Sequence, residues 1–311
     1  MKFLKPKFWD KNEPSFLSYM LLPISFIYFM LSKIKIYKKK KIQNIKTICV
    51  GNIYIGGTGK TTLCLKISEI INSMGLSSCF VKKYYSSQID EQKILKNNGE
   101  LYCDNSRVSA LKKINSEKIN VAIFDDGLQD QKIKYDLSIV CFNKNIGLGN
   151  GFLIPSGPLR ENLSSLKKYD AIFFNGNDKS ESEFEKFIKE KFTHLKVFKS
   201  LYKIKNNENF DKKEKYLIFA GIGNFENLIE MLKINDFSIV KSLNYPDHYN
   251  YNQSDIDKIK KIANDNNAKI ITTEKDFVKI SHEDQKNINK IEVELDILNK
   301  DDFTNFLSKK I

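Results

Sequence analysis

The sequence has very little arginine. Of its 51 basic residues only Arg107 and Arg160 are arginine, and all the others are lysine. Arginine can bind a phosphate or a carboxylate through two parallel hydrogen bonds, which lysine cannot do. In a chain where lysine replaces arginine almost everywhere, we expect the two arginines to lie where that geometry is needed, for example at a phosphate. The alternative is that both have survived by chance.

Cysteine and histidine are also scarce. The chain has five cysteines, an odd number, with no spacing typical of a metal site, and three histidines. This argues against a structural zinc site and indicates small buried residues of a protein from a reducing compartment. The cysteines are Cys49, Cys64, Cys79, Cys103 and Cys141.

The net charge is +13, which would suit a nucleic acid or an anionic membrane surface as partner. The excess is lysine spread along a chain that is also rich in Asn and Ile, and such a bias can be mutational. No helix-turn-helix or zinc signature accompanies it. We therefore expect no nucleic-acid partner, and a nucleic-acid-binding ATPase remains an alternative on charge alone.

An apolar and aromatic run covers residues 15–31, and a basic segment follows at 33–41. The run has about 17 residues, the lower limit for a membrane span, and Pro23 interrupts it. Trp9, Asp10 and Glu13 precede it and no cleavage site follows, which argues against a signal peptide. We expect a helix at the membrane interface, with its lysines on the headgroups. A helix packed on the core and a true span are the alternatives.

Residues 46–66 combine an apolar strand, a glycine-rich turn and the start of a helix, which is the order of a phosphate-binding loop. Glycines let the backbone turn and aim N–H groups inward, and the helix N-terminus adds partial positive charge. Lys60 can reach the terminal phosphates and the Thr61 hydroxyl can bind Mg²⁺. Tyr54 stands where the strict pattern has glycine. The expected nucleotide-binding residues are Tyr54, Ile55, Gly56, Gly57, Thr58, Gly59, Lys60 and Thr61.

A second motif supports the first. Asp125 and Asp126 directly follow a short apolar run at 121–124, which is typical of a strand buried on both faces. In open parallel sheets ligands bind beyond the carboxyl ends of the strands. Carboxylates there can hold Mg²⁺ on the β- and γ-phosphates. Together the two motifs predict a site for Mg²⁺ and ATP or GTP.

Strands and helices alternate along most of the chain, which is typical of a doubly wound α/β fold. We expect a segment 1–44 with the apolar helix, a P-loop NTPase-like domain at 45–200, a linker at 201–214, and a smaller α/β domain at 215–311 that closes a cleft. The expected strands are 47–50, 78–81, 121–124, 137–142, 171–174, 215–220, 238–243 and 268–272. The expected helices are 61–74, 92–97, 106–114, 181–191, 225–232 and 253–264.

Three loops carry further polar residues. Residues 149–161 are rich in glycine and proline and include Arg160, residues 245–251 place His248 among tyrosines, and residues 272–276 follow an expected strand. Each loop alone could be an ordinary surface turn.

These segments, in this order and spacing, resemble the tetraacyldisaccharide 4′-kinase family of lipid A biosynthesis over nearly the whole chain. The resemblance includes Phe-Trp at 8–9, Ala-Gly-Ile-Gly-Asn at 220–224 and Thr-Glu-Lys-Asp at 273–276. Members of that family also lack the first glycine of the loop. The resemblance implies ATP-dependent phosphorylation of the 4′-hydroxyl of a tetraacylated glucosamine disaccharide 1-phosphate, at the cytoplasmic face of the bacterial inner membrane. We expect the chain to act there as a monomer.

The resemblance also implies roles for particular residues. Lys60 matches the catalytic lysine of the loop, and Asp125 and Asp126 the Mg²⁺-binding pair. Asp90 matches the family's catalytic aspartate and would deprotonate the sugar hydroxyl together with His248. Because these two residues fall in different expected domains, we expect the site to form on domain closure. The residues implied at the substrate or its phosphate are Lys83, Tyr85, Arg107, Gln129, Arg160 and Glu161.

Two segments depart from the family pattern. The family's Ser-Arg-Gly-Tyr appears here as Lys-Lys-Tyr-Tyr at 82–85, so that Lys83 and Tyr85 would stand in for its Arg and Tyr. The family's Asp-Asp-Gly-x-Gln-His ends here in Asp130, an anion in place of a histidine. A family member that has lost its activity is therefore an alternative. A partitioning or metal-insertion ATPase is another, because Gly-Gly-Thr-Gly-Lys-Thr-Thr resembles that class as well.

Overall fold

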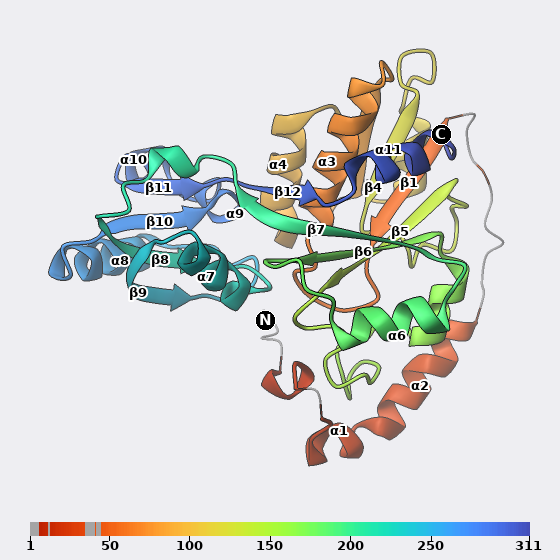
Figure 1. The fold of residues 1–311 in the computed structure, drawn as a ribbon, viewed down its shortest axis with the longest axis horizontal. Coiled ribbons are helices and arrows are strands. Elements are labelled where there is room, and N and C mark those ends of the chain that lie inside the picture. The colour runs from red at the N-terminus through yellow and green to blue at the C-terminus, as the bar shows by residue number, and fades with distance from the viewer. Residues whose placement is uncertain (1–5, 12, 35–40, 42–44) are drawn as a thin grey trace. The chain divides into compact units, whose positions relative to one another are not determined.

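The computed structural model describes residues 6–11, 13–34, 41 and 45–311 (Figure 1). Most of the basic segment at 33–41 lies outside the described residues. The chain divides into two compact units. The larger unit consists of the described residues within 5–84, 99–201 and 297–311, and the smaller unit of residues 85–98 and 202–296.

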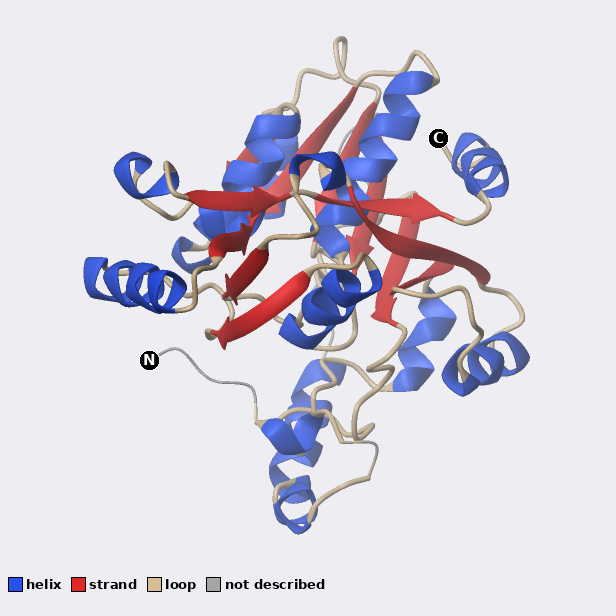
Figure 2. Ribbon diagram, turned by 60° about the vertical axis from the view of Figure 1, so that its left-hand side comes forward, coloured by secondary structure: helices blue, strands red, loops and turns tan. Residues whose placement is uncertain are grey.

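An eight-stranded sheet forms the centre of the larger unit, and helices flank it (Figure 2). Every strand pair whose register is resolved in this sheet is parallel. Two strands, β7 and β12, carry the chain from one unit to the other. In spatial order the strands are β12 (Val293–Ile297), β7 (Lys196–Ile204), β6 (Ala171–Gly176), β5 (Leu137–Asn143), β1 (Lys46–Gly51), β4 (Val121–Asp125), β2 (Ser78–Lys83) and β3 (Leu101–Asp104).

Helices cover both faces of this sheet because its central strands are apolar on both sides. Phe173 and Phe174 are neighbours in β6 and therefore point to opposite faces. Phe174 packs against Phe184 of α6 (Glu183–Lys191), whereas Phe173 packs against Phe303 of α11 (Lys300–Ser308). The face of α6 also holds α5 (Arg107–Lys112). The remaining large helix, α3 (Lys60–Ser73), buries a stripe of Leu63, Cys64, Ile67, Ile70 and Ile71.

The register of the central strands brings the two expected motifs together. Val50 of β1 pairs with Asp125 of β4, and Gly51 pairs with Val140 of β5. The glycine-rich turn that follows β1 and the acidic pair that ends β4 therefore leave the same edge of the sheet side by side.

Two short helices, α1 (Phe16–Met20) and α2 (Leu22–Lys33), precede the sheet. Two of their serines, Ser18 and Ser25, are buried against the protein. Ser18 accepts a hydrogen bond from Asn150, and Ser25 donates to Ser156 and to the carbonyl of Leu153. Their large apolar side chains are exposed instead, for example Phe16 (80%) and Phe26 (63%). Among the described residues, no helix has both the length and the apolar character needed to cross a membrane.

The smaller unit contains a four-stranded parallel sheet with one large helix on each face. The face with Tyr216, Ile218 and Ala220 packs on α7, and the face with Leu217 and Phe219 packs on α8. In spatial order the strands are β11 (Ile288–Ile291), β10 (Lys269–Thr273), β8 (Lys215–Ala220) and β9 (Ser238–Asn244). The helices are α4 (Ile89–Asn98), α7 (Phe225–Ile234), α8 (Gln253–Asp265), α9 (Glu274–Phe277) and α10 (His282–Gln285).

Helix caps fix where the main helices of this unit begin. The Asn252 side chain accepts from the backbone N–H of Asp255, and the Asp255 carboxylate accepts from the N–H of Asn252, which starts α8. The Asn224 side chain caps α7 by accepting from the backbone N–H of Asn227 at 3.2 Å.

The α/β fold with parallel sheets is confirmed, and the units differ from the expected segments in two respects. Residues 85–98, expected in the first domain, pack with residues 202–296 because α4 lies on α9. Residues 201–214, expected as a linker, contain the end of β7, and Phe210 is buried against Tyr216 and Phe237. The polar composition of that segment concealed its one buried aromatic ring.

We expect Phe303→Ala to destabilise the larger unit by about 3–5 kcal/mol, because it leaves a cavity beneath Phe173 and Phe198. Urea unfolding followed by the fluorescence of Trp9, the single tryptophan, reports on this unit. Phe187→Ala is the matched control, because Phe187 is 40% exposed and should cost less than about 1 kcal/mol. Equal losses in the two variants would contradict the packing of α11.

Candidate active site

The glycine-rich turn is held in shape by two asparagines from strand ends. Gly56 and Gly59 have positive φ angles of 129° and 78°, and Gly59 caps the start of α3. The Asn52 amide donates to the Thr58 hydroxyl at 3.0 Å, and the Asn175 amide donates to the Thr58 carbonyl at 2.6 Å. Thr58 is thereby buried and the turn has one fixed path into the helix N-terminus.

Asp125 is almost completely buried, with one of its two carboxylate oxygens engaged. Oδ2 accepts hydrogen bonds from the Thr61 hydroxyl at 3.1 Å and from the Lys82 ammonium at 2.6 Å. Oδ1 is buried without a hydrogen-bond partner among the described residues. An orphaned carboxylate oxygen beside a threonine hydroxyl fits a divalent cation with oxygen ligands, so these residues suit Mg²⁺.

Asp126 is held in a left-handed backbone conformation, with φ at 61°. Its N–H donates to the Val50 carbonyl at 2.8 Å, and its own carbonyl accepts from Arg107. Arg160 Nη1 donates to both carboxylate oxygens, at 2.8 and 3.0 Å. Burial would raise the pKa of Asp126, but the charges of Lys60, Arg160 and Lys82 outweigh it and lower the pKa to about 2.

The loop at 149–161 positions Arg160 by pairing with the chain before the phosphate loop. Ile55 N–H donates to the Pro158 carbonyl at 2.8 Å, and Arg160 N–H donates to the Ile53 carbonyl at 2.7 Å. Tyr54 is buried beside this loop and its hydroxyl bonds to Asp10. The residue that departs from the strict glycine pattern therefore fills space between the phosphate loop and the N-terminal segment.

Gln129 and Glu161 form a polar group next to Arg160. The Gln129 amide nitrogen donates to Glu161 at 2.9 Å and to the Asn52 carbonyl at 3.0 Å. Glu161 also accepts from the Tyr169 hydroxyl at 2.8 Å. The two residues therefore lie at the same edge of the sheet as the phosphate loop.

Asp130, which departs from the family pattern, faces Arg107. Its carboxylate lies 3.7 Å from Arg107 Nη1. Burial would lower the pKa of Arg107, but nearby groups including Tyr135, Asp126 and Asp130 outweigh it and raise the pKa. The anion at position 130 is thus offset by one of the two arginines.

Asp90 and His248 are hydrogen bonded within the smaller unit. His248 Nδ1 lies 3.0 Å from each carboxylate oxygen of Asp90, which is 2% exposed. Burial would raise the pKa of Asp90, but the hydrogen bond from His248 and the charges of Lys275 and Lys279 outweigh it, and the pKa falls below its ordinary value. Because α4 belongs to this unit, the pair forms within one unit, whereas the sequence had placed its members in two domains.

The loop that carries His248 is anchored through Gly221 and Asp276. His248 has a φ of 58° and its N–H donates to the Gly221 carbonyl at 3.1 Å. Gly221 N–H donates to the fully buried Asp276 at 2.9 Å. A Cβ at position 221 would lie 2.8 Å from the Pro246 carbonyl oxygen, so the motif at 220–224 needs glycine there.

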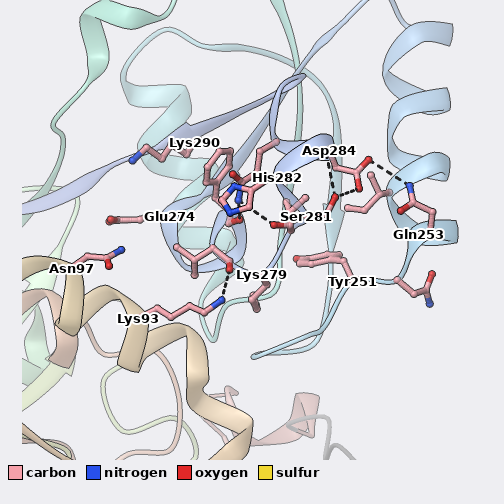
Figure 3. Close-up of a pocket in the computed structure, with 16 residues that line it drawn as sticks. Lys93, Asn97, Tyr251, Gln253, Glu274, Lys279, Ser281, His282, Asp284 and Lys290 are labelled. Atoms are coloured by element: carbon pink, nitrogen blue, oxygen red, sulfur yellow. Dashed lines mark hydrogen bonds between the residues drawn. The ribbon is translucent and has the colours of Figure 1, made fainter. Parts of the chain in front are cut away.

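A pocket of about 670 Å³ also lies in the smaller unit, and Lys93, Tyr251, Glu274 and Lys279 are among its lining residues (Figure 3). None of the site residues expected from the sequence lines it. Lys279, which lines it, has its Nζ 3.5 Å from Asp90.

The structure therefore groups the expected residues as two sets. The phosphate loop, Asp125, Asp126, Arg107, Gln129, Arg160 and Glu161 converge in the larger unit, and Asp90 and His248 in the smaller one. Lys83 ends β2, and Tyr85 precedes α4, where its carbonyl accepts from Gln92 at 2.9 Å. Four residues that sequence reasoning missed belong to these sets: Asn52, Lys82, Asn175 and Lys275. A charged or amide side chain at the end of an apolar strand was the available signal for the first three.

The fold and the phosphate loop define a P-loop kinase-like α/β protein. The chain belongs to the tetraacyldisaccharide-1-P 4′-kinase family, whose model matches residues 17–100 and 90–311. Membership of this family argues against the alternative function stated above, that of a partitioning or metal-insertion ATPase.

Relatives cover the whole chain. The tetraacyldisaccharide 4′-kinase of Pelagibacter ubique is 49% identical over 309 residues, which are 99% of this chain and 98% of that protein. The kinase of the same name from Rickettsia canadensis is 35% identical over 332 residues, covering 100% and 97%. The crystal structure of LpxK from Aquifex aeolicus in complex with ATP matches with a TM-score of 0.68 and 21% identity, over 94% of this chain and 99% of that one. At 21% identity, the similarity to the Aquifex aeolicus structure supports the fold of this chain.

We expect Arg160→Met to lower the unfolding free energy by about 1–2 kcal/mol at pH 7, and this loss to shrink as the pH falls. The pKa of Asp126 is about 2 in the folded state and near 4 in the unfolded state. The ionised carboxylate therefore stabilises the folded state fully at pH values above about 4. That contribution is lost as the pH falls through about 2. The difference in unfolding free energy between wild type and variant, measured from pH 5 to pH 2.5, should therefore decrease.

Lys168→Met is the control, since Lys168 is 62% exposed and lies 3.5 Å from Glu161. It should cost no more than about 0.5 kcal/mol at any pH. A loss in Arg160→Met that does not change with pH would show that Arg160 does not act through the Asp126 carboxylate.

Proposed function

We propose that this chain transfers the γ-phosphate of ATP to the 4′-hydroxyl of a tetraacylated glucosamine disaccharide 1-phosphate, a late step in lipid A synthesis. Membership of the kinase family along nearly the whole chain carries this proposal. In the reaction the hydroxyl oxygen forms a bond to the γ-phosphorus and the bond from that phosphorus to the bridging oxygen breaks, which releases ADP. The hydroxyl proton passes to a base on the protein.

The larger unit binds the nucleotide in this proposal. The backbone N–H groups of the loop and the N-terminus of α3 hold the phosphates, with Lys60 at the transferred group. Thr61, Asp125 and Asp126 would hold Mg²⁺, which when bound neutralises charge on the β- and γ-phosphates. The ATP in the Aquifex aeolicus structure supports the choice of nucleotide.

Arg160 is suited to a phosphate as well as to Asp126. It uses only Nη1 for the two carboxylate oxygens, and among the described residues Nη2 and Nε have no hydrogen-bond partner. Its side chain is 26% exposed, so the rest of its planar group can reach a bound molecule. We therefore propose that Arg160 binds the transferred phosphate or the 1-phosphate of the acceptor.

The smaller unit supplies the base. Asp90 is the proton acceptor because its carboxylate is charged at neutral pH, and His248 orients it through the bond at 3.0 Å. The short α4 that carries Asp90 is fixed in this unit by the Lys93 ammonium, which donates to the Val278 carbonyl at 3.0 Å.

The helices α1 and α2 dock on a membrane surface. Their large apolar side chains are exposed, while Ser18 and Ser25 turn toward the protein. Such a surface costs free energy in water and is stabilised at the boundary between headgroups and acyl chains. It would bring the enzyme to an acceptor whose four acyl chains keep it in the inner membrane.

We expect Asp90→Asn and His248→Gln each to lower kcat for phosphate transfer by about 10²–10⁴-fold, because the first removes the base and the second removes the imidazole that orients it. The assay follows transfer of the labelled γ-phosphate of ATP to tetraacyldisaccharide 1-phosphate in detergent micelles. His194→Gln is the control and should keep full activity. Transfer at the wild-type rate by Asp90→Asn would refute the assignment of the base, and no transfer by wild type that binds Mg-ATP would refute the acceptor.

We expect the double variant Phe26→Ser, Met30→Ser to bind vesicles at least about 10-fold more weakly, because each apolar side chain contributes roughly 1.5–3 kcal/mol when buried. Co-sedimentation with phosphatidylglycerol–phosphatidylethanolamine vesicles measures this. The control is Phe187→Ser, Ile234→Ser, which removes two side chains of similar exposure (40% and 58%) elsewhere. Equal loss of binding in both double variants would argue against docking through α1 and α2.

A further inference from the structure

His248 lies in a cluster of charged side chains from three segments of the smaller unit. Helix α4 contributes Asp90 and Glu91, the loop after β9 contributes Asp247, and α9 with the residues after it contributes Lys275 and Lys279. Glu91 and Asp247 lie 3.7 and 3.9 Å from His248 Nε2. Three carboxylates therefore surround one imidazole.

Lys275 supplies the opposing charge at the second ring nitrogen. Its Nζ lies 2.9 Å from Asp247, 3.3 Å from Glu91 and 3.4 Å from His248 Nε2. Burial would lower the pKa of Lys275, but Asp247, Glu91 and Asp90 outweigh it and hold the pKa well above its ordinary value. The three N–H groups of the ammonium thus have three acceptors, and one of these is the imidazole.

The nearest neighbour of each ring nitrogen, Asp90 at Nδ1 and Lys275 at Nε2, indicates where the ring carries its hydrogen. An ammonium can only donate, so Nε2 must present its lone pair to Lys275. A carboxylate can only accept, so Nδ1 must carry the hydrogen that it donates to Asp90. A ring with a hydrogen on Nδ1 and a lone pair on Nε2 is neutral.

We propose that Lys275 is a positioning residue that keeps His248 neutral with its hydrogen on Nδ1, and so keeps Asp90 as an oriented, unprotonated base. This inference rests on the proposed function, in which Asp90 accepts the proton of the sugar hydroxyl. Lys275 acts through His248 and does not itself contact the reacting atoms. Without it, Glu91 and Asp247 would accept a second hydrogen on Nε2, and the imidazolium would make Asp90 a weaker base.

Nuclear magnetic resonance of the protein labelled with ¹⁵N in the histidine rings tests this directly. The chain has only three histidines, so His194→Gln and His282→Gln assign the signals without altering the cluster. In wild type at pH 7.5 we expect His248 to give the pattern of a neutral ring with hydrogen on Nδ1. In Lys275→Met we expect a population of imidazolium or of a ring with hydrogen on Nε2.

Two further variants separate this role from a general effect of charge or folding. Lys275→Arg keeps the cation and should keep the wild-type pattern. Lys269→Met removes a lysine of the same unit that pairs with Glu214 at 3.0 Å, and the His248 signals should not change. The signals of His194 and His282 report whether each variant is folded. A wild-type imidazolium, or an unchanged His248 pattern in folded Lys275→Met, would overturn the proposal.

Kinetics give a second readout. In Lys275→Met the acid limb of the profile of kcat against pH should move up by about one pH unit, with the KM for ATP unchanged. A loss of kcat that is the same at every pH would indicate a merely structural role for Lys275 and would overturn the proposal. The magnetic resonance result does not depend on activity, so a chain inactive on the disaccharide would refute the proposed function while leaving the assignment of Lys275 testable.

Discussion

Buried carboxylates need a matching positive charge, and the geometry of both candidate sites depends on how lysines meet that need. Asp90, Asp125 and Asp276 are at most 2% exposed. Lys82 lies 2.6 Å from Asp125, and Lys279 lies 2.6 Å from Asp276 and 3.5 Å from Asp90. Removing one partner of such a pair leaves a buried charge without compensation, which costs about 3–5 kcal/mol. The lysines therefore fix the orientation of the acidic residues before any substrate binds.

The strands that could be predicted from the sequence are those that consist of an almost uninterrupted run of apolar residues. The apolar runs of β1, β4, β5 and β6 lie in the middle of the sheet, where both faces are covered. The strand β7 was missed because Lys196, Lys199 and Lys203 interrupt its apolar residues. The strand β3 has only four residues, all half-buried, at the edge of the sheet. Strands with one solvated face carry a weaker signal, and a lysine-rich composition weakens it further.

The residues of the candidate site also fall into those that a local sequence pattern predicts and those that only the fold brings together. The phosphate loop and the acidic pair are contiguous in sequence, so their chemistry could be predicted from local pattern. Asp90 and His248 are 158 positions apart, and only the family resemblance paired them. Lys82 and Lys275 were not singled out, because one lysine among 51 basic residues carries little signal until the fold sets it against a carboxylate. The abundance of lysine made these two lysines hard to single out, whereas the scarcity of arginine drew attention to Arg107 and Arg160.

The two arginines show what lysine could not replace. Both contact Asp126: Arg107 donates to its carbonyl, and Arg160 donates to its two carboxylate oxygens. Asp126 has a φ of 61°, a conformation that non-glycine residues keep only when their surroundings hold them in it. Two planar groups with several donors each can hold the carbonyl and the carboxylate at once, and still reach Asp130 and Gln129. The arginines are therefore retained at the acidic residue that follows β4, and this fixes the backbone where the phosphate loop and the acidic pair meet.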